Sequence, residues 1–544
     1  MTPERQKLLF ELSENETDDY QPSTPQPNNN SSTSIPDTSS QRQQKDIDNK
    51  QNSISSLPSS RSTTSKDNQQ DYQYSHTAIT EYTQLDVDDS EVNSPYRDSH
   101  QHRPLLLPDD DDEDEENLSL NSQDELEAKF YRLPSEGGTI FASFLNMANS
   151  IIGAGIIGIP YSVKEAGFGF GIILLIVLTF VVDWTIRLLI FNGKLAGRTT
   201  YQDLLQFAFG RPGLIAISIF QFAFAFGGTC AYCVIIGDTI PHVIKSLFPS
   251  IEQTPVLWIF ANRKLCITFF TLFVSYPLSL YRDISKLAKT SALALLAIVF
   301  ITVSVAVESP NVPTELRGSM ENRFNFMNDE VFQAIAVISF AFVCHHNSFL
   351  IFGSLKQPSL NRFAKVTHYS MTIAFITCVI LGLSGYLAFT EKTAGNILNN
   401  FPSDNVFINI ARLAFGLNMF TTIPLEIFVC REVLETFFWP SKGFDIKLHF
   451  FLTTSLTLIA LTISLLTCNL GIVLELTGAF SATALAYILP PLCYLKMATG
   501  SIWHWNKLPH WACLIFGIAV MAFSSFYSLQ KLFTNQEAST AICD

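Results

Sequence analysis

A glycine-rich segment inside an apolar stretch is the part of the sequence best suited to binding a small polar molecule. The stretch is FASFLNMANSIIGAGIIGIPYSVKEAGF, in which a regular helix is disfavoured by Gly153, Gly155, Gly158 and Pro160. Glycine costs about 1 kcal/mol in a helix interior. A helix that breaks there exposes N–H groups and a positive half-helix end, which suit a carboxylate; the alternative is close packing through small residues. Asn146 and Asn149, just before the glycines, need partners such as a cation or a substrate.

A second polar cluster interrupts the apolar stretch VFQAIAVISFAFVCHHNSFLIFGSL. It consists of Cys344, His345, His346, Asn347 and Ser348. Polar side chains in such a stretch are expensive and are usually functional. Each histidine either bonds to a neighbouring helix or has a proton-sensitive or substrate-contacting role. Further ligands at metal-binding spacing are absent, so no metal site is predicted.

A third stretch, RLAFGLNMFTTIPLEIFVCREVLE, places side-chain oxygens on one apolar helix. Asn418, Thr421 and Thr422 offer oxygen ligands that suit Na⁺. The alternative is that the threonine hydroxyls bond back to their own helix. Two carboxylates, Glu426 here and Glu475 further along, either relay protons if they are buried or pair with arginines at the rim.

These polar groups belong to a very apolar chain. A transmembrane helix needs about 20 mostly apolar residues. Eleven candidate stretches are present: 140–161, 168–192, 213–241, 264–281, 289–308, 330–353, 366–389, 406–431, 448–467, 470–495 and 510–532. We therefore expect an all-α membrane protein of eleven helices, because lipid offers no partner to backbone polar groups. In the second stretch, Asp183 and Arg187 stand four residues apart and are predicted to pair with each other.

The charge is divided between two different parts of the chain. Residues 1–128 contain 28 of the 49 acidic residues but 9 of the 35 basic ones. They are rich in Ser, Gln, Asn, Asp and Pro, which predicts a disordered acidic tail. Counted between the apolar stretches and at their terminal residues, even-numbered loops carry 14 basic residues and odd-numbered loops carry 7. This bias places the tail in the cytosol and the short tail 533–544 on the luminal or extracellular side.

Several classes of function are disfavoured by what the sequence lacks. There is no P-loop, GxSxG, HExxH or Rossmann fingerprint, so neither an enzyme nor a bound cofactor is expected. No basic tract suggests nucleic acid, and the partners expected are the lipid bilayer and a small molecule. A channel is disfavoured because no ring of charges and no carbonyl filter motif is present.

Four motifs in order along the chain resemble the amino acid/auxin permease family. They are NMANSIIGAGIIGIPYSVKEAG, FAFVCHHNSFLIFGSL, TTIPLEIFVCREVL and LELTGAFSATALAYILPPLCYLK. Within that family they are most similar to the sodium-coupled neutral amino acid transporters and the fungal vacuolar amino acid transporters. The resemblance covers residues 135–532. It implies a leucine-transporter-like fold, with a five-plus-five inverted repeat and broken first and sixth helices, and amino-acid transport by alternating access.

The resemblance also implies binding residues. The substrate α-carboxylate and α-amine are placed against Ile152, Gly153, Ala154 and Gly155 and against Ser339, Phe340, Ala341, Phe342 and Val343, with Asn146 nearby. A coupling cation is placed near Asn149 and Thr421 or Thr422. Few strong charges lie in these segments, which favours neutral amino acids. The coupling ion is either Na⁺ or H⁺; protons are permitted by His345, His346, Glu426 and Glu475.

The expected location is a vacuolar or lysosomal membrane, with the plasma membrane as the alternative. Glu4, Leu8 and Leu9 match an acidic dileucine sorting pattern, so the tail offers a contact for sorting or signalling partners. The alternative function is an amino-acid receptor that keeps the fold and signals through residues 1–128. Deleting the tail distinguishes the two, because a transporter keeps its flux and a receptor loses its output.

Overall fold

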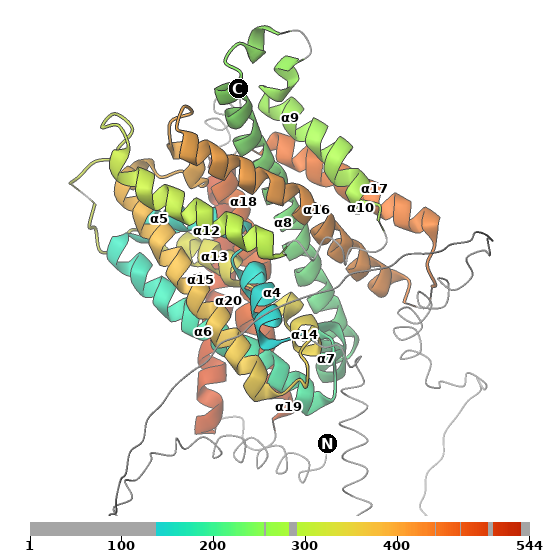
Figure 1. The fold of residues 1–544 in the computed structure, drawn as a ribbon. Helices are drawn as coiled ribbons and strands as arrows, with labels where there is room; N and C mark the ends of the chain where they lie inside the picture. Colours follow the sequence, from blue (N-terminus) through green and yellow to red (C-terminus); the bar gives the residue numbers. More distant parts are fainter. Residues whose placement is uncertain are drawn as a thin grey trace, which may run out of the picture. The chain divides into compact units, whose positions relative to one another are not determined.

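The computed structural model describes residues 138–534, apart from 255, 256, 282–290, 322, 441, 468 and 499–503. The described residues form helices and connecting loops, with an isolated bridge between Gly138 and Leu355. Figure 1 shows the long helices side by side as a bundle. The predicted acidic tail, its sorting pattern and residues 535–544 of the second tail lie outside the described residues.

The long helices coincide with the predicted apolar stretches. The uninterrupted ones are α6 (Phe168–Ala196), α8 (Arg211–Leu247), α12 (Ser291–Glu308), α15 (Leu360–Phe389), α16 (Val406–Phe438), α17 (Ile446–Leu466) and α20 (Leu508–Thr534). The interrupted ones are α4 (Ile140–Ile151) with η2 (Ala154–Gly158) and α5 (Ile159–Ala166), α13 (Val331–Phe342) with α14 (His345–Gly353), and α18 (Leu470–Thr477) with η9 (Gly478–Ala482), η10 (Ala484–Ile488) and α19 (Leu489–Met497). By length and composition, nine spans of the described chain can cross a membrane, and the bent first span makes a tenth.

The predicted span 264–281 is helical but is not one of these ten. It consists of α9 (Arg263–Phe270), η5 (Thr271–Ser275) and α10 (Tyr276–Ser279). The junction residues Thr271 and Tyr276 keep right-handed helical dihedrals, so the pieces form one helix that widens into a π turn. The count of eleven membrane helices stays a prediction.

One short helix, α7 (Tyr201–Phe209), was not predicted from the hydropathy pattern. Its start is capped by Thr200, whose Oγ1 accepts from the N–H of Asp203 at 3.1 Å. It ends at Gly210, whose φ of +67° favours glycine. The remaining short turns lie in connecting loops: η3 (Ile251–Gln253), η4 (Leu257–Phe260), η6 (Ser309–Asn311), η7 (Thr390–Lys392), η8 (Ile397–Asn400) and η11 (Trp505–Lys507).

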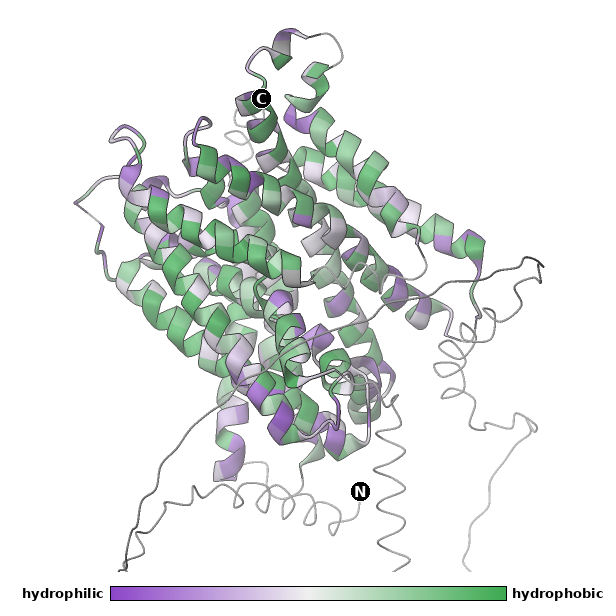
Figure 2. Ribbon diagram, viewed as in Figure 1, coloured by the Kyte–Doolittle hydropathy of each residue, from purple (hydrophilic) through white to green (hydrophobic). Residues whose placement is uncertain are grey.

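The outward faces of the long helices are strongly apolar. Figure 2 shows hydrophobic residues along the helices and hydrophilic ones gathered towards helix ends and loops. Large apolar side chains are exposed on several helices, among them Phe180 (72%), Leu350 (74%) and Leu466 (79%). An apolar surface of this extent needs lipid around it, because in water it would drive association. The structure is therefore that of a multi-pass membrane protein.

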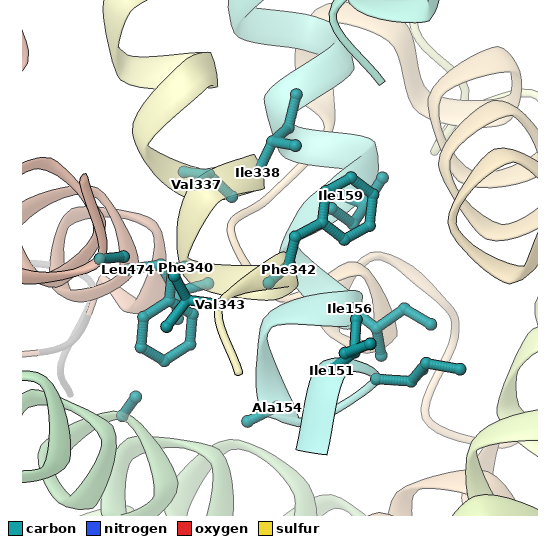
Figure 3. Packing of buried hydrophobic residues seen from close by; sticks show 14 of the residues in the cluster. Ile151, Ala154, Ile156, Ile159, Val337, Ile338, Phe340, Phe342, Val343 and Leu474 are labelled. Carbon is teal, nitrogen blue, oxygen red and sulfur yellow. The ribbon is translucent and has the colours of Figure 1, made fainter. Parts of the chain in front are cut away.

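The first and sixth spans run antiparallel beside each other in the middle of the bundle. At one end the N–H of Gly138 donates to Ser354 O at 2.8 Å, and the N–H of Lys356 donates to Gly138 O at 3.0 Å. Further along, a Cβ added at Gly158 would lie 3.3 Å from Val337 Cγ1. Figure 3 shows the apolar core between them, with Ile156, Ile159 and Ala154 on one side and Val337, Phe340 and Phe342 on the other. Inside lipid such packing is held by van der Waals contact.

Candidate functional site

The first span is interrupted at Ile152 and Gly153. Ile152 (φ −85°, ψ 57°) and Gly153 (φ −86°, ψ −149°) leave helical geometry between α4 and η2. The two halves are bent by 43°. Pro160 lies in the first turn of α5, where proline is tolerated because its missing N–H would be unpaired anyway. The break therefore lies within the glycine-rich segment, as predicted.

This interruption leaves backbone donors without partners. The N–H of Ile152 still donates to Ala148 O at 2.7 Å, but the N–H of Gly153 has no hydrogen-bond partner within the described residues. Ala154 and Gly155 open a 3₁₀ turn, so their N–H groups have no intrahelical acceptor. A Cβ added at Gly153 would meet nothing within 4 Å. Open space therefore lies directly beside a set of unpaired donors.

The sixth span is interrupted at Val343 and Cys344. Val343 is extended (φ −71°, ψ 117°), and α14 begins one residue after Cys344. The N–H of Val343 donates to Ser339 O at 3.1 Å. The carbonyls of Phe340, Ala341 and Phe342 end the helix without intrahelical donors, and they carry its negative dipole end. This second break therefore offers acceptors where the first offers donors.

The two interruptions lie at the same level of the bundle. On one side of both breaks, Asn347 Nδ2 donates to Ser150 Oγ at 3.0 Å. On the other side of both breaks, a Cβ added at Gly155 would lie 2.7 Å from Ala341 Cα. Because these two contacts bracket both breaks, the donors of the first span and the carbonyls of the sixth lie at the same level of the bundle.

The surroundings of the breaks are mainly apolar and aromatic. The ring centroid of Phe224, on α8, lies 5.4 Å from that of Phe340 and 4.9 Å from that of His346. Phe342 and Val343 are each 1% exposed. The predicted substrate segments Ile152–Gly155 and 339–343 are thus brought together by the fold.

The Ser339 hydroxyl at the second break already has partners. It donates to Ile335 O at 2.6 Å and lies 3.1 Å from the hydroxyl of Tyr487.

The predicted cation residues are more scattered. Asn146 is exposed and Asn149 is half-buried on α4. Thr421 and Thr422 are half-buried on α16, and their hydroxyls donate to Asn418 O at 2.9 and 2.8 Å. The hydroxyls thus bond back to their own helix, although each oxygen keeps lone pairs for another partner. Within the described residues no hydrogen bond joins Asn149 to either threonine.

Three of the four proton-relay candidates have an unpaired buried atom in the described part of the chain. His345 Nε2 lies 3.0 Å from Thr185 Oγ1, which is the neighbouring-helix bond considered for it. The Nδ1 atoms of His345 and His346 and Oε2 of Glu426 are buried without a hydrogen-bond partner. Glu426 faces α8, since its Cδ would be 3.9 Å from a Cβ added at Gly228.

Glu475 is different, because it is 0% exposed and bonded at both oxygens. Its ion-pair partner is Lys531 of α20, at 3.2 Å, and not an arginine at the rim.

Comparison with known proteins identifies the family of this chain. Residues 136–533 match the family model described as transmembrane amino acid transporter protein. The chain belongs to the transmembrane amino acid transporter family. Vacuolar amino acid transporter 2 of Saccharomyces cerevisiae is 42% identical over 393 residues, which cover 70% of this chain and 82% of that protein. The putative sodium-coupled neutral amino acid transporter 11 of Rattus norvegicus is 38% identical over 385 residues, 70% of this chain and 82% of the relative. The human protein of the same name is 35% identical over 364 residues, 66% of this chain and 87% of the relative.

The family and these relatives are transporters and not enzymes. Because the family is one of amino acid transporters, the substrate of this transporter is an amino acid. The resemblance to the amino acid/auxin permeases is therefore confirmed.

The predicted ion pair inside the second span of the transporter is also confirmed. Arg187 Nη2 lies 2.8 Å from Asp183 Oδ2. His368 of α15 adds a second partner that was not predicted, with Nδ1 2.9 Å from Asp183 Oδ1. This group ties α6 to α15 and leaves no unpaired carboxylate oxygen on Asp183.

Sequence reasoning missed several polar contacts of the transporter. Arg412 is 0% exposed, and its guanidinium bonds to the carbonyls of Leu398 and Phe401 at 2.7 and 2.8 Å. The partners of Glu475, which are Tyr161, Ser528 and Lys531, were also missed. A usable signal existed for Lys531, because a lysine inside an apolar span calls for a partner.

Proposed function

We propose that this transporter is an ion-coupled carrier of neutral amino acids that binds its substrate between the two interruptions. The observation that supports this is the pair of contacts that brackets both breaks, Ser150–Asn347 and Gly155–Ala341. They bring unpaired donors and unpaired acceptors to one level, beside the open space at Gly153. A zwitterion needs both kinds of partner within a few ångströms.

In this proposal the α-carboxylate bonds to the N–H groups of Gly153, Ala154 and Gly155, and the α-amine bonds to the carbonyls at the end of α13. Helix ends of these two polarities suit those two charges. The substrate side chain extends towards Phe224 and Phe340, which are apolar. A neutral side chain fits such surroundings better than a charged one, because a buried charge needs a partner. The relatives named for neutral amino acids support the same choice.

Transport proceeds by alternating access in this proposal. The antiparallel first and sixth spans are what an inverted repeat requires of its two opening helices. Spans one to five and six to ten then form the two halves of a leucine-transporter-like fold, with the helix of α9, η5 and α10 as the fourth span and α20 as the eleventh. The two halves rock around the bound substrate and expose it to one side at a time.

We place the carrier in a vacuolar or lysosomal membrane with its N-terminus in the cytosol. The relative of Saccharomyces cerevisiae is named as vacuolar, and the loop charges favour the stated orientation.

Two residue sets are candidates for the coupling ion. Asn149, Thr421 and Thr422 would hold Na⁺, whereas His345, His346, Glu426 and Glu475 would carry H⁺. We favour H⁺, because no hydrogen bond joins Asn149 to Thr421 or Thr422 within the described residues, and because Glu475 is a fully buried carboxylate.

The test is uptake of a panel of labelled amino acids into proteoliposomes, with H⁺ and Na⁺ gradients imposed separately. We expect accumulation of at least one neutral amino acid, competed by the same amino acid unlabelled. Protein-free liposomes are the control for leak. The proposal is wrong if folded protein neither accumulates nor exchanges any member of the panel.

A further inference from the structure

A buried cluster of ionisable side chains lies away from the two interruptions. It is contributed by α5, α18 and α20, and its members are Tyr161, Glu165, Glu475, Ser528 and Lys531. We call it the carboxylate–lysine cluster. It joins both turns of α5 and the last turns of α20 to the second turn of α18, so the three helices meet at the same end of the bundle.

Every member of the cluster is held by short contacts. Glu475 Oε1 accepts from the Tyr161 hydroxyl at 2.9 Å and from Lys531 Nζ at 3.2 Å, and its Oε2 accepts from the Ser528 hydroxyl at 3.1 Å. Lys531 Nζ also donates to the Tyr161 hydroxyl at 2.6 Å and to the Glu165 oxygens at 3.3 and 3.4 Å. One ammonium group therefore serves two carboxylates on two different helices.

The charges in the cluster are unequal. The side chains of Glu475 and Glu165 are 0% and 6% exposed, and that of Lys531 is 22% exposed. In the described chain, no second cation lies within 4.0 Å of either carboxylate. The other ionisable groups facing the cluster are Lys164, whose Nζ donates to Thr393 O at 3.3 Å, and Glu330 at the start of α13.

A proton balances this arrangement. Two carboxylates that share one buried ammonium group leave one negative charge without a close counter-charge, and a proton on either carboxylate would neutralise it. When water enters the same site, both carboxylates are solvated and the proton is released. Closing the cluster therefore favours binding of the proton, and binding of the proton favours the closed cluster to the same extent.

The cluster is placed where the transport cycle would open and close it. α5 is the second half of the interrupted first span and packs against α13, which also packs against α18 and α20. A movement of α5 relative to α18 and α20 would separate Glu165 and Tyr161 from Glu475. Because Lys531 is partly exposed, water reaches the cluster from this end of the bundle.

We propose that the Glu165–Glu475 pair, held by Lys531, is the site that binds and releases the coupling proton. The step is a proton transfer alone. One carboxylate takes a proton from water and forms an O–H bond as the cluster closes. That bond breaks and the proton returns to water as the cluster opens. The proposal rests on the proposed function, since it names the ion and the residues that drive that carrier. By the predicted orientation, the cluster faces the lumen, which is the acidic side of a vacuolar membrane.

The test separates coupling from substrate binding. Purified protein in proteoliposomes is assayed for exchange of labelled against unlabelled amino acid at equal pH, and for uptake driven by a pH gradient. A pH-sensitive dye inside the vesicles reports proton flux when substrate is added. Exchange needs no net proton movement, so it reports the substrate site alone.

The variants are Glu475→Gln and Glu165→Gln, which mimic the protonated carboxyl groups. We expect each to keep exchange within about twofold of the unaltered protein and to lose about tenfold or more of its gradient-driven uptake, with no substrate-induced proton flux. Glu165→Gln is the milder change, because the contacts of Lys531 Nζ with the Glu165 oxygens are long, at 3.3 and 3.4 Å, and it keeps the test valid if Glu475→Gln fails to fold. The matched control is Asp238→Asn in the buried Asp238–Arg263 pair (3.1 Å) of α8 and α9, which should keep both activities.

The proposal is overturned if both glutamine variants keep full gradient-driven uptake and proton flux. It is also overturned if the unaltered protein responds to a Na⁺ gradient and not to a pH gradient. Absence of exchange by the unaltered, folded protein would instead contradict the proposed function, so the two failures are distinguishable.

Discussion

Gly155 of the first span lies against the backbone of Ala341 in the sixth. A Cβ added at Gly155 would lie 2.7 Å from Ala341 Cα and 2.9 Å from both Ala341 Cβ and Phe340 Cδ1. Two of these atoms belong to a backbone or to a short side chain, so they cannot move aside as the end of a long side chain could. Glycine is needed here for the close approach of the two interrupted helices.

We therefore expect Gly155→Ala to push the first and sixth spans apart. Overpacking of this kind costs about 1–3 kcal/mol, and the larger Gly155→Leu should abolish folding or uptake altogether. Thermal unfolding in detergent and amino-acid uptake measure the two effects. Gly443→Ala is the control, because a Cβ there would meet nothing within 4 Å. An unchanged melting temperature in Gly155→Ala would mean that the two spans are not in contact.

The neighbouring glycine gives the opposite prediction. A Cβ at Gly153 would meet nothing within 4 Å. We expect Gly153→Ala to leave thermal stability unchanged and to raise KM by about tenfold, because the added methyl group occupies space beside the donors of the substrate site. Uptake kinetics and thermal unfolding on one preparation check this. A KM equal to that of the unaltered protein would place the substrate elsewhere.

The first break was predictable and the second was not, for a physical reason. Glycines and Pro160 remove helix-stabilising groups within the segment itself, so the break after Ile151 is encoded locally. Around Val343 no glycine or proline is present, and the helix ends in a tertiary setting formed by Phe224 and Gly155. The break in the sixth span is expected from the family resemblance. Helix propensity alone predicts a continuous helix through Val343.

The partners of Glu475 illustrate the limit of reading contacts from one segment at a time. Its lysine lies 56 positions away along the chain and its tyrosine 314 positions away. Hydropathy predicted the helices that carry all three, but the rotation of each helix about its own axis decides which side chains meet. That rotation is set by packing across the bundle, which no local pattern encodes.

The hydrogen bond between Ser150 and Asn347 should couple the two interrupted helices energetically. Asn347 Nδ2 donates to Ser150 Oγ at 3.0 Å, just outside both breaks. We expect Ser150→Ala and Asn347→Ala each to slow uptake, and the double variant to be no slower than the worse single one. A coupling energy of about 0.5–1.5 kcal/mol in the double-mutant cycle corresponds to one hydrogen bond. Strictly additive losses would show that the bond does not contribute in the rate-limiting state.

The threonines of α16 provide the decisive test between the two coupling ions. Thr421 and Thr422 both donate to Asn418 O, so replacing them by valine removes the oxygens while keeping the branched shape of each side chain. If H⁺ is the coupling ion, Thr421→Val with Thr422→Val should change pH-gradient-driven uptake by less than about twofold, since a hydroxyl that bonds back to its own helix contributes little.

The control is the double serine variant, Thr421→Ser with Thr422→Ser, which keeps both hydroxyls. If Na⁺-stimulated uptake is present in the unaltered protein, survives in the serine variant and disappears in the valine variant, the cation binds at these hydroxyls and the proton assignment is wrong. Uptake under separate Na⁺ and H⁺ gradients decides between them, because the valine variant removes ligands that only a metal cation needs while leaving Glu165, Glu475 and Lys531 untouched.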